Sequence, residues 1–177
     1  MERGVSDWKH VIRLADLARG SVSVRLEPDA ETLGKLAKEL NLEALLAFSG
    51  KLTVRPWLDG AEILGRYSAR VVQICGVTLD PFEEELEGEI ALQVVPPGSP
   101  HALIESEGSE ISLDLDAPDP PDVLESEEID LAHYLVEQLV LDLDPFPRKP
   151  GVAFDYTPAV TEESPFAVLK TLKGDGE

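Results

Sequence analysis

The sequence feature that most constrains the fold is a long β-like pattern between Leu45 and Val95. Within it, Phe48–Trp57 and Ile63–Ile74 have strand character, and the turn residues Leu58-Asp59-Gly60 separate them. An Asp-Gly pair between two such runs is a strong signal for a β-hairpin. A third segment, Phe82–Val95, alternates glutamates with apolar or small residues. Three consecutive antiparallel strands predict a meander that needs a covering layer on its apolar side.

Two amphipathic helices are predicted to supply this layer. Residues 30–40 have apolar side chains at helical spacing, with Asp29 as a suitable N-cap. The second helix is Leu131–Leu143, with Asp130 as N-cap. Residues 10–27 contain short strand-like segments, which we expect to join residues 46–95 in one sheet. We therefore expect one α+β domain over the whole chain, in which a mostly antiparallel, curved sheet or partial barrel packs with two to three helices.

Residues 96–128 are expected to form an acidic, mobile loop of this domain. They hold six prolines and closely spaced acidic residues, and only Ile111–Leu115 has strand character. Like-charged, proline-rich segments bury too little apolar surface to order fully. After the second long helix, residues 165–172 have the pattern of a short C-terminal helix.

Charge is distributed very unevenly along the chain. Residues 71–147 contain no lysine or arginine, yet they carry 20 of the 35 acidic residues. The flanking segments are nearly balanced, so the formal net charge of −20 is concentrated in this window. Such a field repels phosphate backbones and attracts basic protein surfaces. A solvated face that keeps the protein soluble is the alternative interpretation.

The complete absence of basic residues favours a docking surface, because an ordinary surface mixes both signs of charge. We predict that an acidic patch, uninterrupted by cationic groups, binds a cationic partner. The predicted partner-binding residues lie on the third strand and near the end of the acidic loop, namely Glu83, Glu84, Glu85, Glu87, Glu89, Asp119, Asp122, Glu125, Glu127 and Glu128.

Residues that could support catalysis or metal binding are sparse. His10, His101 and His133 are scattered, and no nucleophile motif or phosphate-binding loop occurs. Cys75 is the single cysteine, so an internal disulfide is impossible, and a small buried side chain is its favoured interpretation. We predict a non-enzymatic protein with no catalytic residues, cofactor or metal. The absence of a secretory or membrane-spanning segment favours a cytoplasmic protein, expected to be a monomer.

Three segments together resemble the YceD family of bacterial and plastid proteins. They are VVQICGVTLDPFEEELEGEI, IDLAHYLVEQLVLDLDPFPRKPG and SPFAVLKTLK, and they occur in the order and spacing of that family. The resemblance runs from about residue 45 to the C-terminus. Family members often carry C-x-x-C at the position of Val72–Cys75 and a second Cys/His pair after the segment matching Asp144–Gly151. This chain has valine at the first cysteine position and lacks the later pair.

The resemblance implies a non-enzymatic role in large-subunit ribosomal RNA accumulation. Genes of the family commonly stand beside one for a small, basic large-subunit ribosomal protein. Together with the acidic window, this gives the hypothesis that the chain binds such a protein, or another assembly factor, with ribosomal RNA contacted only indirectly or weakly. The alternative is a direct RNA-binding factor that uses aromatic Trp57 and Tyr67 and the arginines Arg13, Arg19, Arg25, Arg55, Arg66 and Arg70.

Overall fold

The central element of the fold is the predicted three-stranded meander. The computed structural model describes residues 8–102 and 119–154. In it, β3 (Ala44–Trp57), β4 (Gly60–Ile74) and β5 (Pro81–Val95) run antiparallel in sequence order. Trp57 pairs with Gly60 across the tight turn, so the hairpin predicted from the Asp-Gly pair is confirmed.

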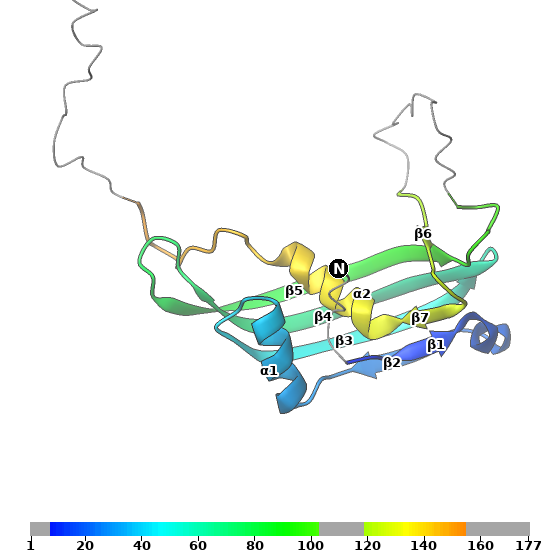
Figure 1. The fold of residues 1–177 in the computed structure, drawn as a ribbon, viewed down its shortest axis with the longest axis horizontal. Coiled ribbons are helices and arrows are strands. Elements are labelled where there is room, and N and C mark those ends of the chain that lie inside the picture. The colour runs from blue at the N-terminus through cyan, green and yellow to red at the C-terminus, as the bar shows by residue number, and fades with distance from the viewer. Residues whose placement is uncertain (1–7, 103–118, 155–177) are drawn as a thin grey trace, which may run out of the picture.

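The meander belongs to a five-stranded sheet in the order β2-β3-β4-β5-β6 (Figure 1). The short strand β2 (Val22–Leu26) pairs antiparallel with β3, whereas β6 (Asp122–Val123) pairs parallel with the end of β5. The expected curved sheet or partial barrel, mostly antiparallel, is therefore confirmed only in part, because the sheet is mixed and open and does not close into a barrel. A barrel requires its two edge strands to pair with each other, and β2 and β6 do not.

One face of this sheet is covered by α2 and by a second, two-stranded sheet (Figure 1). The helix α2 spans Leu131–Asp142, and the small sheet pairs β1 (Val11–Arg13) with β7 (Glu128–Asp130). Leu135 of α2 is fully buried, and a Cβ atom on Gly50 of β3 would lie 2.5 Å from its Cδ1. The glycine therefore lets the helix approach the sheet closely.

The predicted helix caps are confirmed by hydrogen bonds. Asp29 accepts the Thr32 N–H at 2.8 Å and begins α1 (Ala30–Glu39), which contacts β3. Asp130 accepts the N–H groups of Ala132 and His133, and also that of His10 beside β1. Asp130 therefore starts α2 and links it to the N-terminal strand.

The buried side chains form one hydrophobic cluster between the sheet and these covering elements. Leucine, isoleucine and valine side chains from β3, β4, β5 and α2 make up half of it. Trp8, Phe48 and Tyr67 extend the cluster as a row of neighbouring aromatic rings, with centroids about 6 Å apart in each step. No helix in the described ranges combines the length and apolar character that crossing a membrane requires.

Several segment predictions need correction. Of residues 10–27, only β2 belongs to the five-stranded sheet. β1 pairs with β7 in the small sheet, and the 3₁₀ helix η1 (Leu14–Arg19) separates β1 from β2. Residues 119–128, expected within the mobile loop, contain β6 and the first residue of β7. The expected strand Ile111–Leu115, the helix at residues 165–172 and the centre of the acidic loop lie outside the described residues.

Candidate protein-binding surface

The face of the five-stranded sheet opposite α2, here called the open face, carries a charged side chain at every second residue in the first half of β5. On β5 these are Glu83, Glu85, Glu87 and Glu89, all exposed, which we call the Glu ladder. Alternation along a strand places all four on the same side. The intervening positions from Phe82 to Ile90 are half-buried or buried and face α2.

The structure separates Glu84 from the other predicted strand residues. Glu84 has the parity of Phe82 and Leu86, so it lies on the covered face and is half-buried. A run of three consecutive glutamates cannot all point to one side of a strand. Four of the five predicted strand residues therefore share a surface, and Glu84 does not belong to it.

The acidic patch on β5 is not free of cationic groups, because the neighbouring strand β4 carries arginines beside it. Arg66 of β4 is the register partner of Glu89, and its Nη2 lies 2.7 Å from Glu89 Oε1. Arg70 of β4 is likewise the register partner of Glu85. The expected uninterrupted patch is therefore wrong, because antiparallel pairing brings residues 60–74 beside the acidic window whatever their distance in sequence. The Arg66 and Glu89 side chains are 81% and 73% exposed, so water screens their attraction strongly.

Cationic side chains gather on the other strands of the open face. Arg25, Lys51 and Arg66 are successive register partners across β2, β3 and β4, and we call them the cationic row. This row, together with Glu87 and Glu89 of the Glu ladder, borders a shallow depression of about 620 Å³. The open face is therefore divided: the Glu ladder lies along β5, and the cationic row crosses β2, β3 and β4.

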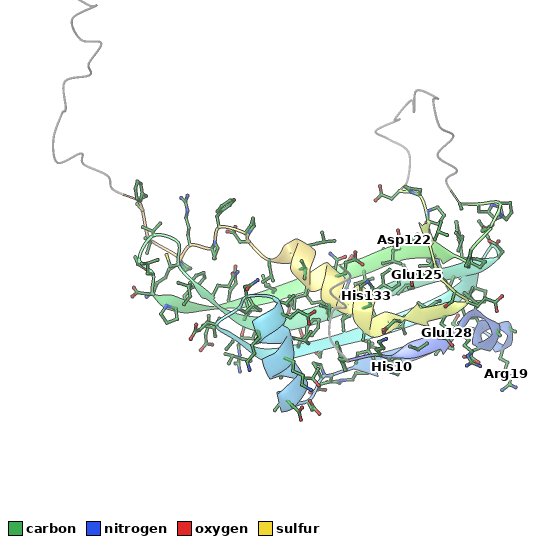
Figure 2. All side chains as sticks on the ribbon, in the orientation of Figure 1. His10, Arg19, Asp122, Glu125, Glu128 and His133 are labelled. Atoms are coloured by element: carbon green, nitrogen blue, oxygen red, sulfur yellow. The ribbon has the colours of Figure 1, made fainter. Side chains whose placement is uncertain are left out.

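The second predicted acidic group lies in the segment that enters β7. Its members are all exposed, and we call them the acidic connection, namely Asp119, Asp122, Glu125, Glu127 and Glu128. Figure 2 shows Asp122, Glu125 and Glu128 following one another from β6 to β7. Glu128 contacts Arg13 of β1, with Oε1 3.3 Å from Nε. Since this segment leaves the sheet edge for the α2 side, the acidic connection and the Glu ladder are two separate surfaces.

Negative charge around the acidic connection also affects α2. Tyr134 on that helix is half-buried, and its burial, with the charges of Asp122 and Glu137, raises the pKa of its hydroxyl to about 12. The Tyr134 hydroxyl therefore stays neutral at physiological pH.

The aromatic residues proposed for RNA stacking are not presented together. Tyr67 is 3% exposed on the covered face, where its hydroxyl donates to the Asp142 carboxylate of α2. Burial, followed by this hydrogen bond, raises the pKa of Tyr67. Tyr67 is thus a core residue and offers no stacking surface. Of the candidate arginines, Arg13 lies on β1 and Arg19 at the end of η1, so neither is on a strand that carries the cationic row.

Cys75 connects the β4–β5 turn to the segment that follows α2. Its side chain is fully buried, and its Sγ accepts the N–H groups of Lys149 at 3.4 Å and Thr78 at 3.5 Å. The Lys149 N–H, with smaller effects from Thr78, lowers the pKa of Cys75 to about 6 against the opposing effect of burial. Gly76 N–H also donates to the Pro147 carbonyl at 2.9 Å. No sequence motif indicated this connection.

Within the described ranges, no three His, Cys, Asp or Glu side chains are placed to share a metal ion. The three histidines are on separate elements, as their sequence spacing indicated: His10 precedes β1, His101 follows β5 and His133 lies on α2.

The fold and this surface define an α+β protein with an open, charge-segregated sheet face. A family model described as "Large ribosomal RNA subunit accumulation protein YceD" matches residues 63–173. The match covers more than half of the chain, which therefore belongs to the YceD family. Searches of curated proteins and of solved structures gave no match. The family description names a role in large-subunit ribosomal RNA accumulation, and it names no reaction.

Proposed function

We propose that this protein supports accumulation of large-subunit ribosomal RNA by binding a basic protein in the cytoplasm, without catalysing a reaction. The partner would be a basic large-subunit ribosomal protein or another cationic assembly factor. The family description supports the process, and the Glu ladder is the observation that supports the mechanism. A rigid strand presents its four exposed carboxylates on one side, so a flexible cationic segment can meet them together.

Electrostatic attraction would bring the partner to this protein and would later allow ribosomal RNA to displace it. A net charge of −20 attracts a cationic protein over distances that salt screens beyond roughly 10 Å at 0.1 M. The bound protein would be shielded from other anionic molecules until it reaches its RNA site. Ribosomal RNA, with one charge per nucleotide, would then compete for the same cationic groups.

The Arg66–Glu89 ion pair on this surface is weak enough for a partner's cationic side chain to replace Arg66. The Arg66–Glu89 pair is largely solvent-exposed, so it contributes at most about 1 kcal/mol to stability. A partner lysine or arginine can therefore replace Arg66 beside Glu89 at little cost. Glu83, Glu85 and Glu87 have no ion pair with any other described residue.

The test compares two fourfold variants that lose the same charge. One is Glu83→Gln, Glu85→Gln, Glu87→Gln and Glu89→Gln, here the ladder variant. The matched control is Glu27→Gln, Glu31→Gln, Glu39→Gln and Glu43→Gln, which alters exposed glutamates outside both acidic surfaces. Binding to purified large-subunit ribosomal proteins is measured by fluorescence anisotropy. We expect the ladder variant to lose at least tenfold in affinity and the control to lose much less. Equal losses would reject the Glu ladder as the binding surface.

Direct ribosomal RNA binding is a second candidate because of the cationic row. Like charges that face each other across strands repel, and a bound phosphate would relieve that repulsion among Arg25, Lys51 and Arg66. Glu87 and Glu89 of the Glu ladder border the same depression and oppose an anionic ligand. We therefore favour the protein partner. A fluorescent fragment of large-subunit ribosomal RNA, tested with Lys51→Gln as the variant, distinguishes the two candidates.

A further inference from the structure

In the part of the chain that the structure describes, the outer edge of β5 is unpaired along most of its length. In the five-stranded order, the only described strand beyond β5 is β6, which pairs with Val94 and Val95 alone. Among the described residues, no backbone or side-chain hydrogen bond is made to the outward backbone groups of residues 83–91. Figure 1 shows β5 at this border of the sheet, with β6 at one end only. An exposed edge of this kind is a template for another extended chain.

The register identifies which backbone groups face outward. Trp57 and Gly60 close a two-residue hairpin, so they exchange hydrogen bonds, and the pairs alternate from there. Counting across β4, Tyr67 and Gly88 form a hydrogen-bonded pair, and the odd-numbered residues of β5 point away from β4. The Leu124 N–H donates to the outward Val95 carbonyl, and the Cys75 N–H to the Asp80 carbonyl, in agreement with this count.

The outward backbone groups therefore belong to the residues of the Glu ladder. Each of Glu83, Glu85, Glu87 and Glu89 has an outward N–H and C=O without a partner among the described residues, and a carboxylate on the open face. A strand that pairs with this edge places its own directly opposed side chains about 5.5 Å away on that same face. Lysine or arginine at every second position would then meet one glutamate each.

We propose that β5 binds its partner by β-strand addition, and that the bound segment is an extended peptide with lysine or arginine at alternate positions. This inference rests on the proposed function, because it states how a basic partner is held. Backbone pairing would provide affinity, and the spacing of the four carboxylates would provide selectivity. The competing interpretation is that the glutamates only prevent edge-to-edge pairing of two copies, since like charges opposite each other repel.

The probes are two peptides of about ten residues, which is a normal strand length. One alternates lysine and threonine, and the other has the same composition with all lysines adjacent. Both carry the same charge, so they differ only in the match to the Glu ladder. We expect the alternating peptide to bind at least fivefold more tightly to the full-length protein. Equal affinity would contradict strand addition.

Amide hydrogen exchange followed by NMR provides the sharper readout. Binding of the alternating peptide should slow exchange at the N–H groups of Glu83, Glu85, Glu87 and Glu89. The amides of Ser23 and Arg25, which by the same count face outward on the opposite edge strand β2, should be unchanged. Binding without this pattern of protection would overturn strand addition.

A matched pair of variants tests the edge without a difference in charge. Glu87→Pro and Glu87→Thr both lose the carboxylate, but only proline removes the outward N–H, which an edge strand tolerates. We expect Glu87→Pro to bind the alternating peptide at least fivefold more weakly than Glu87→Thr, with both folded by circular dichroism. If Glu87→Pro fails to fold, the exchange measurement on the wild-type protein decides the question.

The outcomes separate this proposal from the proposed function. If the ribosomal proteins bind through the Glu ladder but no edge amide is protected, only strand addition is wrong. If neither the peptides nor the ribosomal proteins bind, the proposed function fails and strand addition fails with it.

Discussion

Glycine at position 88 allows a side chain from the neighbouring strand to cross β5 and reach α2. A Cβ atom there would lie 2.3 Å from Tyr67 Cε1 and 2.7 Å from Asp142 Oδ2, the groups on either side of the Tyr67–Asp142 hydrogen bond. The absence of a side chain in the middle of the Glu-rich strand is therefore a packing requirement of the covered face. It leaves the exposed glutamates on the other face unaffected.

We predict that Gly88→Ala destabilises the protein by about 1–3 kcal/mol, because the added methyl group overpacks this contact. Gly34→Ala in α1 is the control: a Cβ at Gly34 meets nothing within 4 Å, and alanine should stabilise the helix by about 0.5–1 kcal/mol. Urea denaturation measures both. An unchanged unfolding midpoint for Gly88→Ala would contradict the packing argument.

The lowered pKa of Glu62 makes its contribution to the stability of the fold depend on pH. The hydrogen bond from Arg55 is the main cause that lowers the pKa of Glu62, although burial opposes it. A carboxylate with a lowered pKa stabilises the fold above its unfolded value of about 4.3, and this stabilisation is lost as the pH falls through the folded value. Wild type should therefore exceed Glu62→Gln in melting temperature near neutral pH. The difference should shrink on acidification below about pH 4. A difference independent of pH would disprove this assignment.

At the scale of the elements, α2 is the main covering layer of the sheet. Leu131, Leu135 and Leu139 are fully buried at helical spacing, while Leu141 on the same helix is 72% exposed. The helix begins at Asp130, which also holds the N-H of His10. The stability of α2 therefore depends on its packing and on its first turn.

We expect Leu135→Ala to lower the free energy of unfolding by about 2–5 kcal/mol, because it leaves a cavity against the backbone of Gly50. Leu141→Ala should change it by less than about 0.5 kcal/mol. Denaturant titration of the pair checks this prediction. Similar losses for both leucines would mean that the helix is not held by its buried face.

The strands and helix caps were predictable because their signals are local. The Asp-Gly turn, the alternation along β5 and the caps Asp29 and Asp130 each act over a few residues. The pairing of β1 with β7 joins residues more than a hundred positions apart, and neither strand exceeds three residues. Strands that short carry almost no periodic signal.

The candidate surface was only partly predictable for a related reason. The charge window correctly indicated exposed glutamates on β5. It could not show which residues from outside the window lie next to them in the folded protein. The hairpin places Arg66 and Arg70 beside Glu89 and Glu85, and strand parity turns Glu84 to the covered face. The hydrogen bond from the Lys149 N–H to Cys75 could not be predicted either, because a lone cysteine after an apolar strand has the pattern of a core residue.

At the scale of the whole molecule, the proposed function requires that the net charge of −20 favours a cationic partner over a polyanion. The acidic connection and the Glu ladder lie on different surfaces, so a polyanion that approaches the cationic row still meets negative charge nearby. We predict that ribosomal RNA is not retained in a gel-shift assay at about 0.15 M salt, where screening leaves a range of about 8 Å. A shift that Lys51→Gln abolishes would instead favour the RNA-binding alternative.

The central claim is that the Glu ladder attracts a cationic protein electrostatically. The most direct measurement is the affinity of purified large-subunit ribosomal proteins for the wild-type protein and for the ladder variant as salt increases from about 0.05 to 0.5 M. The account predicts that the wild-type affinity falls at least tenfold over this range, and that the two proteins converge at high salt. An affinity that barely responds to salt, or is the same for both proteins throughout, would contradict it.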